Sequence, residues 1–266
     1  MISEPREATA AVSQWMEQYG GKIYGLGLRL CGSPEEAEDL VQETFLQAFR
    51  HWDQFEGRSA PSSWLFSIAA RVCKRRHRRR AGEPARLEPL EDLLPSGEPD
   101  VPDVPDRGEG PLEEQLRREA QETVAAALAR LPMAFRLPLV LKDIADLSVP
   151  EIAAVLGIRE ATVKTRVHRA RLALRRELAR LLPRRPAPPP NHDRGVCLDL
   201  LHAKQEALDR GVELPVPPGE LCSRCRSLFL TLDLTQEACH AIGQGTLPPA
   251  VLELLRRQLE ERTERT

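Results

Sequence analysis

The sequence predicts an all-α protein with two small helical domains, an acidic proline-rich linker between them and a helical C-terminal tail domain. Apolar residues recur at intervals of three and four along 11–80 and 112–182, without the alternation of a half-buried strand. Aromatic residues make up 4% of the 266 residues and 23 residues are prolines, a composition that disfavours a large β-sandwich or barrel. The expected units are 1–80, a linker 81–111, a second domain 112–182, a linker 183–190 and a tail 191–266.

The first domain is expected to hold two amphipathic helices. Ser33 and Pro34 have the positions of an N-cap and a first helical residue. The helix that follows has one apolar stripe, which consists of Ala37, Leu40, Val41, Thr44, Phe45 and Ala48. A second helix is expected after residues 59–62 and runs into the basic block 71–80, whose cations are Arg71, Lys74, Arg75, Arg76, Arg78, Arg79 and Arg80.

The charges of the chain are segregated. The formal net charge is -2, yet 71–80 is strongly basic and 83–114 is mostly acidic. Such asymmetry indicates faces that meet a polyanion such as nucleic acid. The first 20 residues lack the basic start and apolar centre of a signal peptide, and no apolar run is long enough to span a bilayer. We therefore expect a cytoplasmic protein, in which clustered cysteines indicate metal or redox sites before disulfides.

The second domain is predicted to end in a helix-turn-helix. Ser148 and Glu151 form a capping-box pattern, and Gly157 is suited to a left-handed helix end. A longer helix follows directly, as in a helix-turn-helix. On a helical wheel at about 100° per residue, its packing side consists of Val163, Val167, Ala170 and Leu174. Thr165, His168 and Arg169 lie opposite, with Lys164 and Arg171 on one flank. Ten lysines and arginines between 159 and 185, against two glutamates, suit phosphate contacts; the alternative is a solvated basic helix.

The two linkers are recognised by their prolines. Residues 81–111 carry seven, Pro84, Pro89, Pro95, Pro99, Pro102, Pro105 and Pro111, among many acidic side chains. This composition is typical of a chain that does not fold alone, so no regular structure is expected there. The second linker contains the run 184–190, RRPAPPP, which is stiff because of its prolines.

Two separate segments resemble one known protein family. Residues 148–171 (SVPEIAAVLGIREATVKTRVHRAR) resemble the promoter-binding C-terminal domain of extracytoplasmic-function sigma factors, which are subunits of bacterial RNA polymerase, and Leu131-Pro132 resembles the entry to that domain. Residues 33–45 (SPEEAEDLVQETF) and 64–71 (WLFSIAAR) are similar to its core-binding and DNA-melting regions. The resemblance covers about 12–80 and 115–182, in the order of the family, and is more specific than a helix-turn-helix alone.

The resemblance assigns roles to residues of this chain. The minus-35 promoter element would be read by Lys164, Thr165, His168 and Arg169, with Arg171 on the flank. The minus-10 element would be melted and captured by residues near 55–64 and by the basic block, chiefly Trp64, Arg71, Lys74, Arg75 and Arg76. Core polymerase would be bound through the clamp helices of its large subunit by Asp39, Gln42 and Glu43. No catalytic residue is expected, because polymerisation chemistry belongs to the core enzyme.

Some alternatives stay open at this point. The acidic linker is either an inert tether or a mimic of nucleic acid in the RNA exit path. A stand-alone helix-turn-helix regulator would also bind DNA, but it leaves the first 80 residues unexplained. Whether a separate anti-sigma factor is a partner, besides core polymerase and promoter DNA, is beyond the sequence.

The tail contains a Cys-x-x-Cys pair, Cys222 and Cys225. Together with Cys197 and His202, or with His192 as the fourth ligand, these residues could bind one zinc ion, since thiolate and imidazole are its usual structural ligands. Their spacing is loosely similar to zinc-binding anti-sigma domains, although Pro218 stands where those have a histidine. The alternatives are a set of small buried residues, a thiol or metal switch that controls the sigma factor, or a metalloenzyme, which nothing else supports. Cys31 and Cys73 are expected to be packing residues.

Overall fold

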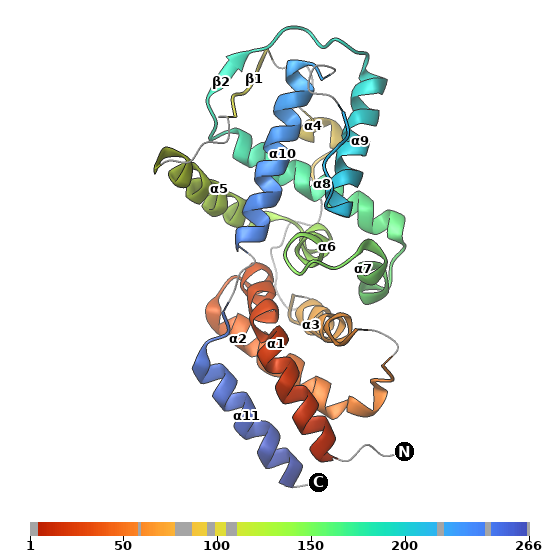
Figure 1. Ribbon diagram of the computed structural model, residues 1–266, viewed down its shortest axis with the longest axis vertical. Coiled ribbons are helices and arrows are strands. Elements are labelled where there is room, and N and C mark those ends of the chain that lie inside the picture. Colours follow the sequence, from red (N-terminus) through yellow and green to blue (C-terminus); the bar gives the residue numbers. More distant parts are fainter. Residues whose placement is uncertain are drawn as a thin grey trace.

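The structure is a computed structural model, and it describes residues 5–57, 60–77, 87–94, 99–104, 111–216, 221–242 and 246–264. Within these residues the chain is almost entirely helical, as predicted, with one small two-stranded sheet. Figure 1 shows an elongated molecule in which the N-terminal helices and the last helix form one end, and the helices between them form the other. None of the described helices combines the length and the apolar character that crossing a bilayer requires.

The N-terminal helices are α1 (Pro5–Cys31), α2 (Pro34–Arg50) and α3 (Pro61–His77), with a short 3-10 turn at Trp52–Gln54. Ser33 caps α2 as predicted, because its hydroxyl accepts a hydrogen bond from the backbone N–H of Glu36. The whole predicted apolar stripe of α2 is buried against α1 and α3. Of the predicted basic block, Arg78, Arg79 and Arg80 lie outside the described residues.

The second group of helices is α5 (Pro111–Arg130), α6 (Met133–Asp143), α7 (Val149–Leu156) and α8 (Glu160–Ala179). The capping box predicted at Ser148 and Glu151 is present, and Gly157 ends α7 at φ 66°, in the left-handed region. The turn between α7 and α8 is therefore set by local chemistry. The predicted helix-turn-helix geometry is confirmed in these elements.

The linkers contain more regular structure than the sequence predicts. A short helix, α4 (Leu90–Leu93), and a strand, β1 (Asp100–Pro102), lie in the first linker, and β2 (Arg184–Pro186) lies in the second. The two strands pair antiparallel, with Val101 opposite Arg185. The expectation of an irregular first linker was wrong in this part, because each linker supplies the hydrogen-bonding partner of the other and composition cannot reveal such a pairing.

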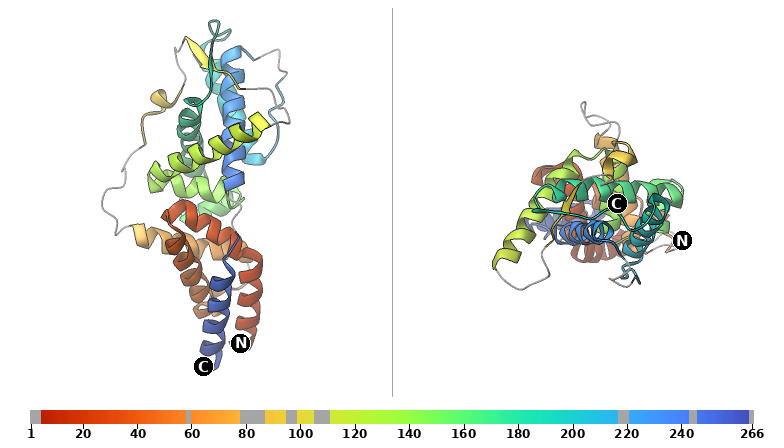
Figure 2. Two further views of the ribbon diagram at one scale, coloured as in Figure 1. Left: turned by 90° about the vertical axis from the view of Figure 1, so that its left-hand side faces the viewer. Right: turned by 90° about the horizontal axis from the view of Figure 1, so that it is seen from above.

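The tail folds into three helices, α9 (Arg194–Arg210), α10 (Ser223–Ile242) and α11 (Pro249–Glu264), in the predicted order. Helices α9 and α10 lie beside α8, whereas α11 crosses to the other end of the molecule and packs on α1 and α2 (Figures 1 and 2). The tail thus contacts both groups of helices.

Candidate nucleic-acid and polymerase interfaces

Helix α8 has the rotation that its sequence predicts. Val163, Val167, Ala170 and Leu174 are fully buried against the neighbouring helices. The side chains of Lys164, Thr165 and His168 consequently leave α8 on the side away from this core. This orientation confirms the predicted packing side of α8 and defines its outer face.

The outer face of α8 is covered by acidic residues of α9. The Lys164 Nζ donates a hydrogen bond to Glu206 Oε1 at 2.6 Å, and His168 Nε2 lies 2.9 Å from Asp209 Oδ2. The hydrogen bond to Glu206 raises the pKa of Lys164, and the same bond lowers the pKa of Glu206. Burial alone would raise the pKa of Asp209, but His168 and Arg171 outweigh burial and lower it. The net effect favours the charged forms of Lys164, Glu206 and Asp209.

The other two predicted minus-35 readers differ in their surroundings. Thr165 is exposed, and its hydroxyl donates to the carbonyl of Ala161 one turn earlier. Arg169 lies under the first linker, where its guanidinium donates to the Glu88 carbonyl at 2.5 Å and sits 5.3 Å from the centre of the Phe135 ring. Thr165 is therefore open to solvent, whereas Arg169 is held by the linker.

Arg171 corrects the prediction made from the helical wheel. Its side chain is 1% exposed and binds Asp143 on α6 with two hydrogen bonds, of 2.6 and 2.9 Å, and Asp209 at 2.7 Å. Burial alone would lower the pKa of Arg171, but the two carboxylates outweigh burial and raise it. Arg171 thus lies in the interior of this structure and not on the outer flank of α8. Its burial is possible because the two carboxylates compensate its charge.

The predicted minus-10 region contains a cluster of aromatic rings. Trp15 contacts Trp52, Phe55 and Trp64, with ring centroids 5.2, 4.9 and 6.0 Å apart. Phe55 also contacts Trp64 at 5.1 Å. All of these rings except Trp15 are partly exposed. The cluster supplies aromatic faces of the kind on which unpaired bases stack.

The described cations of the basic block lie along α3. Arg71 is exposed and donates to the carbonyl and hydroxyl of Ser67, and Lys74 donates to the carbonyl of Leu156 at the end of α7. Arg75 and Arg76 form ion pairs with residues of α2, at 3.3 Å to Glu43 and 3.4 Å to Asp39. The structure therefore links the predicted minus-10 cations to the predicted polymerase-binding carboxylates.

The three predicted polymerase contacts lie together on the polar side of α2. The side chain of Asp39 is 63% exposed, and that of Glu43 is half-buried. Gln42 lies under α11, where its amide donates a hydrogen bond to Gln258 Oε1 at 3.0 Å. One of the three contacts is thus covered by the tail.

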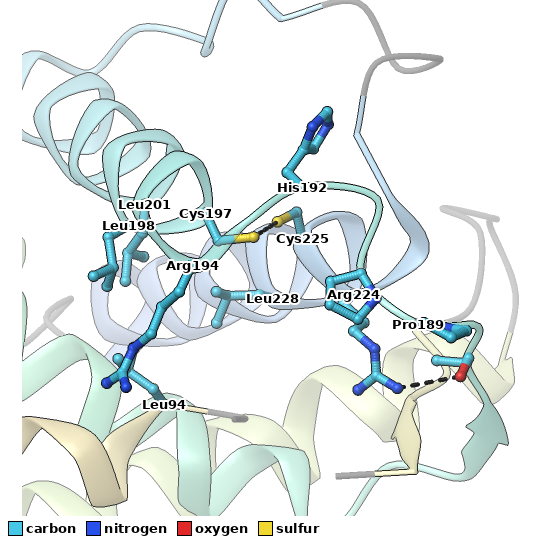
Figure 3. A pocket seen from close by; sticks show the side chains of 12 residues that line it. Leu94, Pro189, His192, Arg194, Cys197, Leu198, Leu201, Arg224, Cys225 and Leu228 are labelled. Atoms are coloured by element: carbon cyan, nitrogen blue, oxygen red, sulfur yellow. Dashed lines mark hydrogen bonds between the residues drawn. The ribbon is translucent and has the colours of Figure 1, made fainter. Parts of the chain in front are cut away.

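Three of the four predicted metal ligands are close together. The thiol of Cys225 donates a hydrogen bond to Cys197 Sγ at 4.0 Å, and Cys222 also interacts with Cys225. Burial, then the neighbouring thiols, raises the pKa of Cys225 to about 12. Burial alone would raise the pKa of Cys222, but hydrogen bonds, chiefly from the Cys225 and Asn191 backbones, outweigh burial and lower it. Cys197 and Cys225 line a mostly apolar pocket of 530 Å³ between α9 and α10 (Figure 3).

The histidines do not complete a metal site in this structure. His202 is exposed on α9 and does not line the pocket, whereas His192 does (Figure 3). In the ranges that the structure describes, no three His, Cys, Asp or Glu side chains form a group able to hold a metal ion. Pro218 lies outside those ranges. All six cysteines are free thiols, and Cys31 and Cys73 are buried packing residues, as predicted.

Sequence reasoning missed the residues that cover the outer face of α8. Glu206 and Asp209 are three positions apart, a spacing that places both carboxylates on one side of a helix. That spacing was a usable signal of an acidic helix face. It does not reveal that the face lies against α8, because long-range packing decides it.

Two family models match the two groups of helices. Residues 15–83 match the family model "Sigma-70 region 2", and residues 121–174 match "Sigma-70, region 4". The "RNA polymerase sigma-H factor" of Pseudomonas aeruginosa is 34% identical, over 62% of this chain and 84% of its own length. A solved structure of the sigma factor RpoE of Bartonella quintana, in complex with the anti-sigma factor NepR, matches 62% of this chain and 94% of that one at 25% identity, with a TM-score of 0.44.

Two further relatives carry the family name. The "ECF RNA polymerase sigma factor SigE" of Mycolicibacterium smegmatis is 36% identical over 64% of each chain. The "ECF RNA polymerase sigma factor SigW" of Bacillus subtilis is 34% identical over 63% of this chain and 89% of its own length. The chain therefore belongs to the extracytoplasmic-function sigma factors, and it is a non-enzymatic factor that directs RNA polymerase in transcription initiation.

Proposed function

We propose that this sigma factor reads the minus-35 element with the outer face of α8, through Lys164, Thr165, His168 and Arg169. The observation that carries the proposal is the orientation of α8 about its axis. The side opposite to this outer face is buried at Val163 and Val167. Lysine and arginine can donate to guanine in the major groove, and threonine can contact either a base or a phosphate. Arg171 is left out of the proposed set because it is buried.

We further propose that α3 and the aromatic cluster capture the minus-10 element. Trp64 and Phe55 would offer stacking faces to unpaired bases, and Arg71, Lys74, Arg75 and Arg76 would neutralise phosphates. Support comes from the position of the rings directly before the basic part of α3. Stacking and charge together suit single-stranded DNA better than a duplex.

The polymerase contact that we propose is the polar side of α2, which would bind the clamp helices of the large subunit through Asp39, Gln42 and Glu43. Support comes from the exposure of Asp39 and from the shared side of the three residues. A cytoplasmic location is part of the proposal, since core polymerase and promoter DNA are the partners.

Run-off transcription with purified core polymerase and a promoter library tests this proposal. Alanine at Lys164, Thr165, His168 and Arg169 together is expected to reduce promoter-specific transcripts on the order of 100-fold or more, because each base-reading side chain is worth about 1–3 kcal/mol. Arg180→Ala is the control, since Arg180 is exposed at the far end of α8 and pairs only locally with Glu177 in the described residues. Unchanged transcripts from the fourfold variant would contradict the proposed reading face.

A second proposal concerns the thiols, and we infer that Cys197, Cys222 and Cys225 bind one zinc ion with His192 or His202. Thiolates at about 2.3 Å from a tetrahedral zinc ion are about 3.8 Å apart, close to the 4.0 Å between Cys197 and Cys225. Cys222 already interacts with Cys225, so binding would have to bring one histidine to these thiols. The ion would act as a structural link between the start of α9 and the start of α10.

The zinc proposal is tested by metal content and thiol reactivity. The purified full chain is expected to hold about one zinc per chain, and Cys225→Ser should lose it. Zinc should also protect Cys197 from alkylation until a chelator removes the metal. Cys31→Ala is the control, because Cys31 is buried at the end of α1, in the N-terminal group of helices. Zinc-free protein whose alkylation is unchanged by added zinc would overturn the proposal.

A further inference from the structure

We propose that the C-terminal segment 194–264 holds this sigma factor in a closed state, in which α9 occupies the minus-35 reading face and α11 the polymerase-binding face. The inference rests on the roles proposed above for α8 and α2. Its own evidence is a set of contacts between the tail and both interfaces. These contacts make the tail an internal competitor of DNA and of polymerase.

Helix α9 presents carboxylates to the cations that would meet DNA. Glu206 binds Lys164 at 2.6 Å and Asp209 binds His168 at 2.9 Å. The side chain of Asp209 is only 6% exposed, and it also binds the buried Arg171. A carboxylate offers the same kind of charged acceptor oxygen as a phosphate. DNA and α9 therefore cannot occupy this face at the same time.

The first linker and α10 also contact cations of α8. The Glu88 carbonyl accepts from Arg169, and the Glu88 carboxylate pairs with Arg176. On the other side of α8, Arg175 donates to Thr231 of α10 at 2.9 Å. The linker and the tail thus engage successive cations along α8 through contacts that do not involve DNA.

Helix α11 is fixed on the N-terminal helices by an apolar seam. Leu255 and Leu259 are 0% exposed, and Val251 is buried with them. Polar contacts flank this seam. Gln258 accepts from Gln42, and Arg256 pairs with Glu17 of α1. Polymerase could reach Gln42 only after α11 moves away.

The two DNA-reading units are also held against each other. Ser63 at the start of α3 donates to Glu151 of α7 at 2.7 Å, and Lys74 of α3 donates to the Leu156 carbonyl at 3.4 Å. In the closed state these hydrogen bonds therefore join the unit proposed to read the minus-10 element to the unit proposed to read the minus-35 element.

The first test reverses one charge at the α9 contact. Glu206→Lys opposes Lys164, and Asp199→Lys makes the same change at an exposed residue of the same helix. Binding of the full chain to a random-sequence DNA duplex is measured by fluorescence anisotropy. Only molecules in which α9 has left α8 can bind DNA. Glu206→Lys should increase their share and is therefore expected to bind DNA about tenfold tighter than Asp199→Lys. Equal affinities would overturn the closed state.

A second comparison separates this inference from the proposed role of α8. Lys164→Ala is added to Glu206→Lys and the DNA affinity is measured again. Loss of most of the gain supports both the closed state and the role of Lys164. A gain that persists would support the closed state and would contradict the assignment of Lys164 as a DNA contact.

The third test releases α11. Leu255→Asp places a charge in the apolar seam, whereas Leu254→Asp changes a side chain that is 43% exposed one position earlier. Affinity for core polymerase is expected to rise about tenfold for Leu255→Asp and to stay unchanged for Leu254→Asp. Arg256→Glu, which opposes Glu17 outside the seam, should act in the same direction even if Leu255→Asp unfolds. Unchanged affinity for Arg256→Glu and for a folded Leu255→Asp would overturn the α11 part.

Discussion

Replacing Asp143 with alanine is expected to lower the free energy of unfolding of the helix-turn-helix domain by about 3 kcal/mol, the lower end of the cost of removing one partner of a buried ion pair, because Asp209 still pairs with Arg171. Asp143 and Arg171 are each 1% exposed, and two hydrogen bonds join them. Without Asp143, the guanidinium would keep Asp209 as its charged partner in a site closed to water. Urea denaturation followed by circular dichroism would measure the loss.

Two control variants decide whether buried charge is the cause. Asp39→Ala removes the same kind of group from a pair that is 63% exposed at Asp39, so it should change the free energy of unfolding by less than about 1 kcal/mol. Because Asp209 also binds Arg171, the three changes Asp143→Leu, Arg171→Met and Asp209→Asn together remove the charges of this buried network and should recover most of the stability. A triple variant as unstable as Asp143→Ala would show that packing, and not the change in buried charge, dominates.

Gly27→Val is expected to destabilise the N-terminal helices by about 3 kcal/mol, the upper part of the range for overpacking. Helices α1 and α2 approach closely at this glycine, where an added Cβ would lie 2.9 Å from both Cα and Cβ of Ala37. Backbone atoms cannot rotate away, so α1 and α2 would have to separate. The variant should therefore also weaken binding to core polymerase in a pull-down assay.

Gly20→Val is the matched control on the same helix. A Cβ at Gly20 would meet the Cδ2 of Leu247 at 2.8 Å, and this atom is the end of a flexible side chain that can turn aside. The free energy of unfolding should change by less than about 1 kcal/mol, since valine is also no worse than glycine inside a helix. Similar losses at both glycines would mean that the close approach of α1 to α2 is not the cause.

Local patterns in the sequence predicted the secondary structure and the orientation of single helices well. The cap at Ser33, the capping box of Ser148 and Glu151, and the left-handed Gly157 depend on neighbours within a few residues. The buried side of α8 follows in the same way from helical periodicity. These features were predictable because the interactions that form them lie within one or two turns.

Contacts between distant segments account for the differences. The wheel placed Arg171 beside Lys164, but Asp143 of α6 and Asp209 of α9 hold Arg171 in the interior. The strand in the acidic linker exists because residues 184–186 pair with it. Each of these outcomes depends on a partner far away in the sequence.

The sequence by itself determined the helical elements, the two sigma regions and the residues that are chemically suited to DNA and polymerase. Only the tertiary structure decided which of those residues are accessible, because α9 and α11 bring carboxylates and apolar side chains from the tail onto α8 and α2. Periodicity fixes the direction of a side chain relative to its own helix. What covers that side chain depends on how the whole chain packs, since buried area and charge pairing are summed over all segments.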